Sequence, residues 1–154
     1  MTKAIHPIAG TLALVTILTF WISTTVSELF SPLATIVMVK TLIPWGFFVL
    51  IPALMAAGGS GFTLSKKRPG NGLIDAKRKR MPFIAGNGIL ILIPAALFLA
   101  FKARAGEFDA AFYGVQIVEL VAGAVNITLL GLNMRDGLRL KSRSPHLSSQ
   151  RRSL

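Results

Sequence analysis

The sequence predicts an all-α integral membrane protein, a bundle of four transmembrane helices with both termini in the cytoplasm (N-in/C-in). Hydrophobic residues make up 53% of the 154 positions and charged residues only 15%, whereas soluble domains carry about 25% charged residues. The apolar residues form four runs, each about as long as the roughly 20 residues that cross a bilayer. The basic residues gather in the gaps between these runs, which is typical of membrane topology signals.

We expect one membrane domain over residues 1–141, with helices near 8–27, 42–64, 82–101 and 110–133. The basic, serine-rich segment 142–154 is predicted to be a disordered cytoplasmic tail. A cleavable signal peptide is the alternative for the first run. However, Lys3 is its only early charge and no clear small-residue cleavage motif precedes Glu28.

The outer boundary of the second helix is left open by the sequence. Residues 33–40 are either a short helix in the membrane interface or the first turns of a long span. Pro44 and Pro52 predict a kinked helix. The cluster 58–61 (Gly-Gly-Ser-Gly) predicts a flexible helix end, since the lysine–serine pair of a phosphate-binding loop is missing.

The third helix is expected to begin at Pro82, in its first turn, and to kink at Pro94. Before it, residues 66–80 are rich in turn formers and positive charge and predict a loop outside the bilayer. A second, short loop is expected over residues 102–109.

Orientation follows from the distribution of Lys and Arg. Fourteen of the 17 basic residues lie on one side: Lys3, seven in the central loop and six in the tail. The other three are Lys40, Lys102 and Arg104. This bias predicts that both termini and the central loop lie on the cytoplasmic side of the membrane.

The fourth helix carries the most informative pattern. Gln116, Glu119, Gly123, Asn126 and Asn133 are spaced as one heptad seam, so they should face the bundle interior. Glu119 would lie roughly 14 Å inside the helix start. Intramembrane ionisable residues are functional by default, and the alternative is that these polar groups only join helices.

Two residues on other helices are candidate partners of this seam. Lys40 could pair with Glu119 if its helix begins near Leu33, but snorkelling to the interface is the favoured interpretation. Asn87 should lie at the depth of Asn126 or Asn133, where an amide contact between helices is expected.

His6 supports a haem alternative, because membrane cytochromes need axial ligands from their helices. Haem b would be held by His6 together with Met134 or with His6 of a second copy. No other cofactor and no metal site is predicted, because cysteines are absent and histidines number two.

The basic central loop should contact anionic lipid headgroups. Nucleic-acid binding is not predicted, because aromatic residues do not alternate with the basic ones. The residues expected to contact lipid are Lys66, Lys67, Arg68, Lys77, Arg78, Lys79 and Arg80.

Several short runs resemble a family of small uncharacterised four-helix bacterial inner-membrane proteins, and the resemblance implies no known activity. The four-span plan is also similar to small multidrug transporters, which carry a key glutamate in the first helix, where residues 8–27 have none. The runs are 6–10 (His-Pro-Ile-Ala-Gly), 20–21 (Phe-Trp), 27–30 (Ser-Glu-Leu-Phe), 58–61 and 131–137 (Gly-Leu-Asn-Met-Arg-Asp-Gly).

Three hypotheses for function follow. The first is a transporter or channel-like protein that moves a small solute or ion, with Glu119 as its ionisable centre, Gln116, Asn126, Asn87 and Lys40 beside it, and a homo-oligomeric assembly. The second is a haem- or quinone-binding redox protein that uses His6. The third is a non-catalytic accessory subunit of a larger membrane complex. No enzymatic motif is found, so catalysis is not the favoured class.

Overall fold

The computed structural model describes the backbone of residues 2–66 and 72–142, and the side chains of residues 5–60 and 79–139. The predicted disordered tail lies outside the described residues, apart from its first position. The elements are α1 (Thr2–Phe30), α2 (Leu33–Lys66), α3 (Gly72–Asn87), the π-helical turn η1 (Gly88–Leu92), α4 (Ile93–Ala105) and α5 (Ala110–Ser142).

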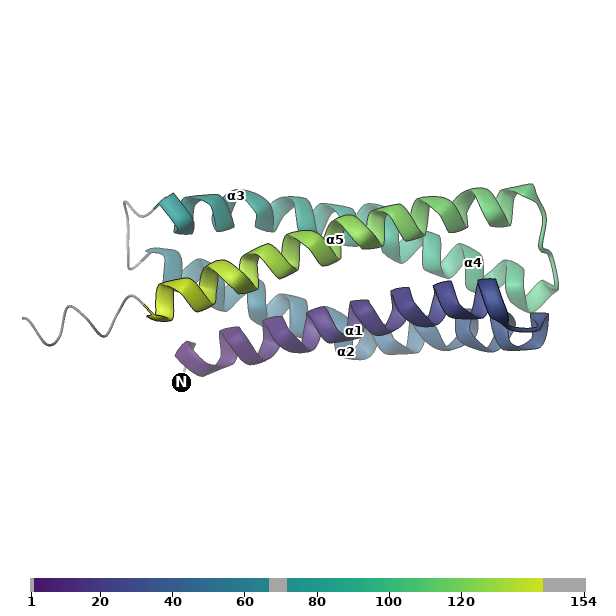
Figure 1. Cartoon of the computed structure of the whole chain (residues 1–154), viewed down its shortest axis with the longest axis horizontal. Helices are drawn as coiled ribbons and strands as arrows, with labels where there is room; N and C mark the ends of the chain where they lie inside the picture. Colours follow the sequence, from purple (N-terminus) through teal and green to yellow (C-terminus); the bar gives the residue numbers. More distant parts are fainter. Residues whose placement is uncertain (1, 67–71, 143–154) are drawn as a thin grey trace, which may run out of the picture.

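The elements form four long rods, because α3, η1 and α4 follow one another without a break. Figure 1 shows the rods side by side. The α1–α2 turn and the α4–α5 loop lie at one end, which we call the hairpin end. The start of α1, the end of α2, the start of α3 and the end of α5 lie at the opposite end, the terminal end.

Four helical segments are long and apolar enough to cross a membrane: Ile5–Phe30, Leu33–Ser60, Lys79–Ala105 and Ala110–Arg139. The predicted all-α bundle is confirmed to this extent. At 26 to 30 residues each, the segments are about 39–45 Å long at 1.5 Å per residue. They also expose large apolar side chains such as Phe48, Leu90 and Phe101, which suits contact with lipid better than contact with water.

The helices are longer than the sequence predicted. Residues 66–80 were expected to be a loop, but α3 begins at Gly72, so Pro82 lies inside a helix and not in its first turn. Lys and Arg are good helix formers, so the helix extends past the apolar segment into a polar region. Hydropathy alone finds only the apolar part of such a helix.

The second rod, α2, is also longer than the sequence predicted. The flexible end predicted at residues 58–61 is wrong, because α2 continues through it to Lys66 and carries Pro44 and Pro52 in its interior. Ser60 donates a hydrogen bond of 2.5 Å to the carbonyl of Ala56. In a bilayer the backbone has no water to replace lost helical hydrogen bonds, which favours continuous helices even across glycines.

The irregularity expected at Pro94 takes the form of a π-helical turn one turn earlier. The Ile93 N–H donates to the carbonyl of Gly88, five residues before it. Proline has no N–H to complete the normal i to i−4 pattern, and a wider turn is one way to accommodate that loss. The wider turn η1 lines the cavity described below.

The α4–α5 loop is tightly ordered. Gly106 adopts a left-handed conformation (φ 72°) at the end of α4, and the Glu107 N–H donates to the carbonyl of Lys102 (3.0 Å). Asp109 caps α5 by accepting the Phe112 N–H (2.9 Å) and binds the Lys102 ammonium (2.6 Å). The Lys102 hydrogen bond, followed by the Phe112 N–H, holds the pKa of Asp109 below its ordinary value.

Two apolar clusters hold the rods together. One lies between α1, α2, α3 and α5, and the other lies between α2, α4 and α5. The first contains Ala13, Ile17, Leu50, Ala53, Ile84 and Leu130, and the second contains Ile36, Leu99, Ala103 and Phe112. Three of the ten are alanines, whose small side chains let helices approach closely where lipid provides no hydrophobic driving force.

Candidate functional site

The heptad seam predicted on α5 faces the interior. Gln116, Asn126 and Asn133 are buried, with Asn126 fully inaccessible. Gly123 is also buried, and a Cβ added there would lie 2.9 Å from the ring of Trp21 on α1. The prediction that this seam lies inside the bundle is confirmed, and Gly123 allows α1 and α5 to approach closely.

Lys40 forms an ion pair with Glu119. Because α2 begins at Leu33, Lys40 lies seven residues inside it, about 10 Å from its end. Its Nζ donates to Glu119 Oε2 at 2.7 Å, and the side chain is only 1% exposed against 12% for Glu119. The favoured prediction that Lys40 snorkels to the interface is therefore wrong, because the ammonium points into the bundle and meets a carboxylate there.

Two more polar side chains lie near this pair. Glu28, in the last turn of α1, is close enough to Lys40 and Glu119 for electrostatic interaction with both. Gln116 donates a long hydrogen bond, 3.5 Å, to Glu119 Oε2. Within the described residues, Glu28 Oε1 and Gln116 Oε1 are buried without a hydrogen-bond partner. We call Glu28, Lys40, Gln116 and Glu119 the carboxylate cluster.

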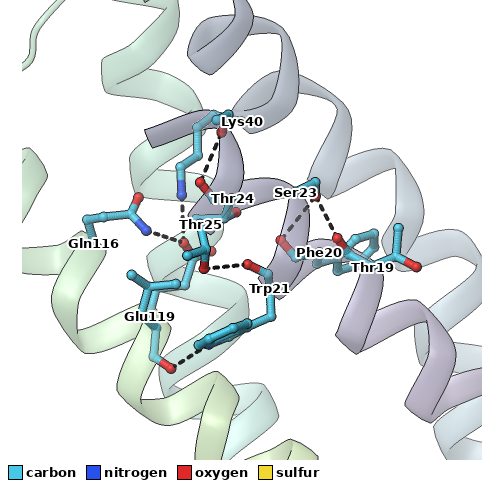
Figure 2. A network of polar contacts seen from close by, with 11 residues as sticks. Thr19, Phe20, Trp21, Ser23, Thr24, Thr25, Lys40, Gln116 and Glu119 are labelled. Atoms are coloured by element: carbon cyan, nitrogen blue, oxygen red, sulfur yellow. Dashed lines mark hydrogen bonds and ion pairs between the residues drawn. The ribbon is translucent and has the colours of Figure 1, made fainter. Parts of the chain in front are cut away.

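The carboxylate cluster joins three rods near the hairpin end. Figure 2 shows Gln116 and Glu119 reaching from α5 toward Lys40, with Trp21 and Thr24 of α1 beside them. The Trp21 indole N–H donates to the Leu120 carbonyl at 2.9 Å, next to Glu119 in the chain. This bond fixes the indole ring against the part of α5 that carries the carboxylate.

A cavity of about 330 Å³ extends from Glu119 toward the middle of the bundle. Its walls come from all four rods, and most of its lining is apolar. Phe20, Trp21 and Phe47 contribute aromatic rings, and Phe20 and Phe47 stack edge to face with centroids 6.3 Å apart. Glu119 is the only carboxylate in the lining as the structure describes it, and Asn126 also contributes. A cavity of this kind suits a small, mostly apolar molecule that carries one polar group.

An amide pair crosses the bundle at the far side of this cavity. Asn87 Nδ2 donates to Asn126 Oδ1 (2.9 Å) and to the Ala122 carbonyl (2.8 Å). Asn126 Nδ2 lies 3.4 Å from the Ile84 carbonyl. The predicted contact between Asn87 and the seam is confirmed, with Asn126 as the partner. Asn133 instead donates only to the Met81 sulfur, at 3.9 Å.

His6 lies between α1 and α2. Its Nδ1 is 2.9 Å from the Ala57 carbonyl and 3.1 Å from Ser60 Oγ, and a carbonyl only accepts, so Nδ1 carries a proton. The proposed second ligand, Met134, accepts a hydrogen bond from Thr11 at 3.9 Å. Neither contact tests whether haem binds, and the haem alternative stays a prediction.

Only two of the seven predicted lipid-contacting residues, Lys79 and Arg80, have described side chains. Arg80 donates to Asp136 Oδ2 at 2.8 Å, which joins α3 to α5 at the terminal end. Lys79 is exposed. The side chains of Lys66, Lys67, Arg68, Lys77 and Arg78 lie outside the described ones.

Two residues of the site were missed in the sequence. Glu28 was placed just beyond the first helix, although α1 extends to Phe30 and carries it in the last turn. Trp21 was named only in the Phe-Trp pair of the resemblance and was not predicted to belong to a site. Their spacing could have revealed them. Trp21, Thr24 and Glu28 recur at intervals of three and four residues and so share a helix face.

Comparisons with known proteins give no match to a family model, to a curated protein or to a solved structure. No group of three or more potential metal-ligating side chains occurs among the described residues.

Proposed function

We propose that the protein is a small transporter of the bacterial inner membrane that couples solute movement to the binding and release of a proton at the carboxylate cluster. The observation that carries this proposal is the buried ion pair between Lys40 and Glu119, with a second carboxyl, Glu28, within electrostatic reach. Buried ionisable groups are costly in a membrane and mark ion or proton pathways.

The charge balance of the cluster explains why a proton should exchange there. The cluster contains two carboxyl groups and one ammonium. If all three are ionised, one negative charge is uncompensated in a water-poor region, which is unfavourable. The cluster becomes neutral when it takes up one proton or one external cation. Lys40 pairs with Glu119 and interacts electrostatically with Glu28 as well, so its charge can compensate either carboxyl when the other changes state.

The remaining parts of the site fit this role. Glu119 belongs both to the cluster and to the cavity lining, so a bound solute would contact the group that exchanges the proton. The buried Gln116 oxygen is available to accept a hydrogen bond from a protonated carboxyl or a bound cation. Cavity and cluster both lie within one chain. Homo-oligomerisation remains a prediction that this site does not require.

The first test concerns Glu119. The protein would be reconstituted in liposomes that contain a pH-sensitive dye, and an inward proton gradient would be imposed together with a Na⁺ or K⁺ gradient. We expect the wild type to dissipate the proton gradient faster than empty liposomes, and the Glu119→Gln variant to return to the empty-liposome rate. Glu107→Gln, which changes an exposed carboxyl outside the cavity, is the control. A Glu119→Gln variant indistinguishable from wild type would end the proposal.

The second test concerns orientation, which we infer from the excess of basic residues at the terminal end. The chain has no cysteine, so single cysteines can be labelled without background. In whole cells permeabilised only at the outer membrane, a membrane-impermeant maleimide should label Glu107→Cys, at the hairpin end. It should label Lys79→Cys, at the terminal end, only after the inner membrane is opened. The reverse pattern would invert the proposed topology.

A further inference from the structure

We propose that the cavity binds a small hydrophobic primary amine, whose ammonium group pairs with Glu119 while its apolar body lies among the rings of Phe20, Trp21 and Phe47. This inference rests on the proposed function and names the class of solute. It is carried by the position of Glu119, the only carboxylate in the described lining, at one end of a mostly apolar cavity with aromatic walls.

The size of the cavity sets the size of the ligand. Its volume is about 330 Å³, and a cavity of about 150 Å³ already accommodates benzene. One aromatic ring with a short side chain therefore fits, whereas a large polycyclic molecule does not.

The net charge of the carboxylate cluster favours a cationic ligand. Two carboxyls and the Lys40 ammonium leave one positive charge missing, and the ligand's ammonium supplies it. A primary amine is favoured over a quaternary one because its N–H groups can donate to a carboxylate and to a neighbouring amide oxygen. The buried, unpartnered Oε1 of Gln116 is such an acceptor, adjacent to Glu119.

The cavity opens toward lipid, which suggests how the ligand reaches it. Ile51 and Met55 on α2 and Ile89 on η1 line the cavity and are also exposed on the outer surface of the bundle. An amine crosses hydrocarbon far more easily in its neutral form, because a charge is expensive there. The wide turn η1 forms part of this opening, and π-helical turns are frequent at functional sites.

The protonation states of the cluster and of the amine, before and after binding, determine how many protons are released. Before binding, the cluster holds one exchangeable proton on a carboxyl. The neutral amine takes that proton: the carboxyl O–H bond breaks, an N–H bond forms, and a carboxylate–ammonium pair results. In water near neutral pH the free amine is protonated, so it must lose a proton to the solvent before it enters. Each ligand bound therefore releases one proton to the bulk solution.

Binding would be measured by Trp21 fluorescence in nanodiscs, in a Trp45→Phe background, since Trp45 is exposed and outside the cavity lining. The probe is phenethylamine, and 2-phenylethanol is the neutral analogue of nearly the same shape. We expect a saturable change with phenethylamine, at least about tenfold weaker binding of 2-phenylethanol, and release of one proton per amine bound in weakly buffered solution.

Variants separate charge recognition from simple apolar binding. Glu119→Gln should weaken phenethylamine binding by about tenfold or more, whereas Glu107→Gln should leave it unchanged. Leu92→Phe narrows the cavity without changing the cluster and should also weaken phenethylamine binding, which keeps the test valid if Glu119→Gln does not fold.

The outcomes distinguish this inference from the proposed function. Equal binding of amine and alcohol, unaffected by Glu119→Gln, would overturn the inference and point to a lipid chain or neutral molecule as the occupant. Absence of amine binding while Glu119-dependent proton flux persists would overturn the inference alone. Amine binding without release of a proton would contradict both the stoichiometry and the proton-exchange function.

Discussion

Lys40→Met is expected to destabilise the protein by about 3–5 kcal/mol, the usual cost of removing one partner from a buried ion pair. Lys40 is 1% exposed and its Nζ is 2.7 Å from Glu119. Without the ammonium, the negative charges of Glu119 and of nearby Glu28 are left uncompensated in a region with little water. The variant should recover part of its stability at acidic pH, where the carboxyls are neutral.

The measurement is reversible unfolding in mixed micelles, followed by helical circular dichroism. The double variant Lys40→Met with Glu119→Gln should recover most of the loss, because the orphaned charge is removed along with its partner. Lys102→Met is the matched control, since it breaks an ion pair with exposed acidic partners, and its effect should be much smaller. If the double variant lost as much stability as the two single variants added together, Lys40 and Glu119 would not be energetically coupled.

Asn126→Ala is expected to cost about 2 kcal/mol, because a fully buried amide is lost and Asn87 is left with one unpaired N–H. The cycle with Asn87→Ala should give a coupling energy of about 1 kcal/mol, within the range measured for hydrogen bonds between membrane helices. The same unfolding assay measures both the loss of stability and the coupling energy.

Asn133→Ala is the control for this cycle. Asn133 lies on the same seam and is buried, but its amide donates only to a sulfur at 3.9 Å, which is a weak acceptor. Its replacement should cost clearly less than that of Asn126. If the two losses were equal, the amide pair would contribute nothing beyond its packing.

The sequence by itself determined the number of helices long and apolar enough to cross a membrane and the face of α5 that points inward. Both are properties of one segment read alone: mean hydropathy over about 20 residues identifies a span, and a repeat of three and four residues identifies a helix face. The contact between Asn87 and Asn126 also followed from residue type and depth. The helix ends were predicted too short, because charged helix formers carry α3 beyond its apolar part.

Only the tertiary structure decided what Glu119 meets. Lys40 and Glu119 are 79 residues apart, and their contact depends on the depth at which α2 begins and on the rotation of α2 against α5. Neither quantity is encoded locally, so Lys40 was interpreted as an interface anchor and Glu28 was left outside its helix. A buried carboxylate cluster beside a cavity arises when three helices bring together side chains that each look ordinary in the sequence.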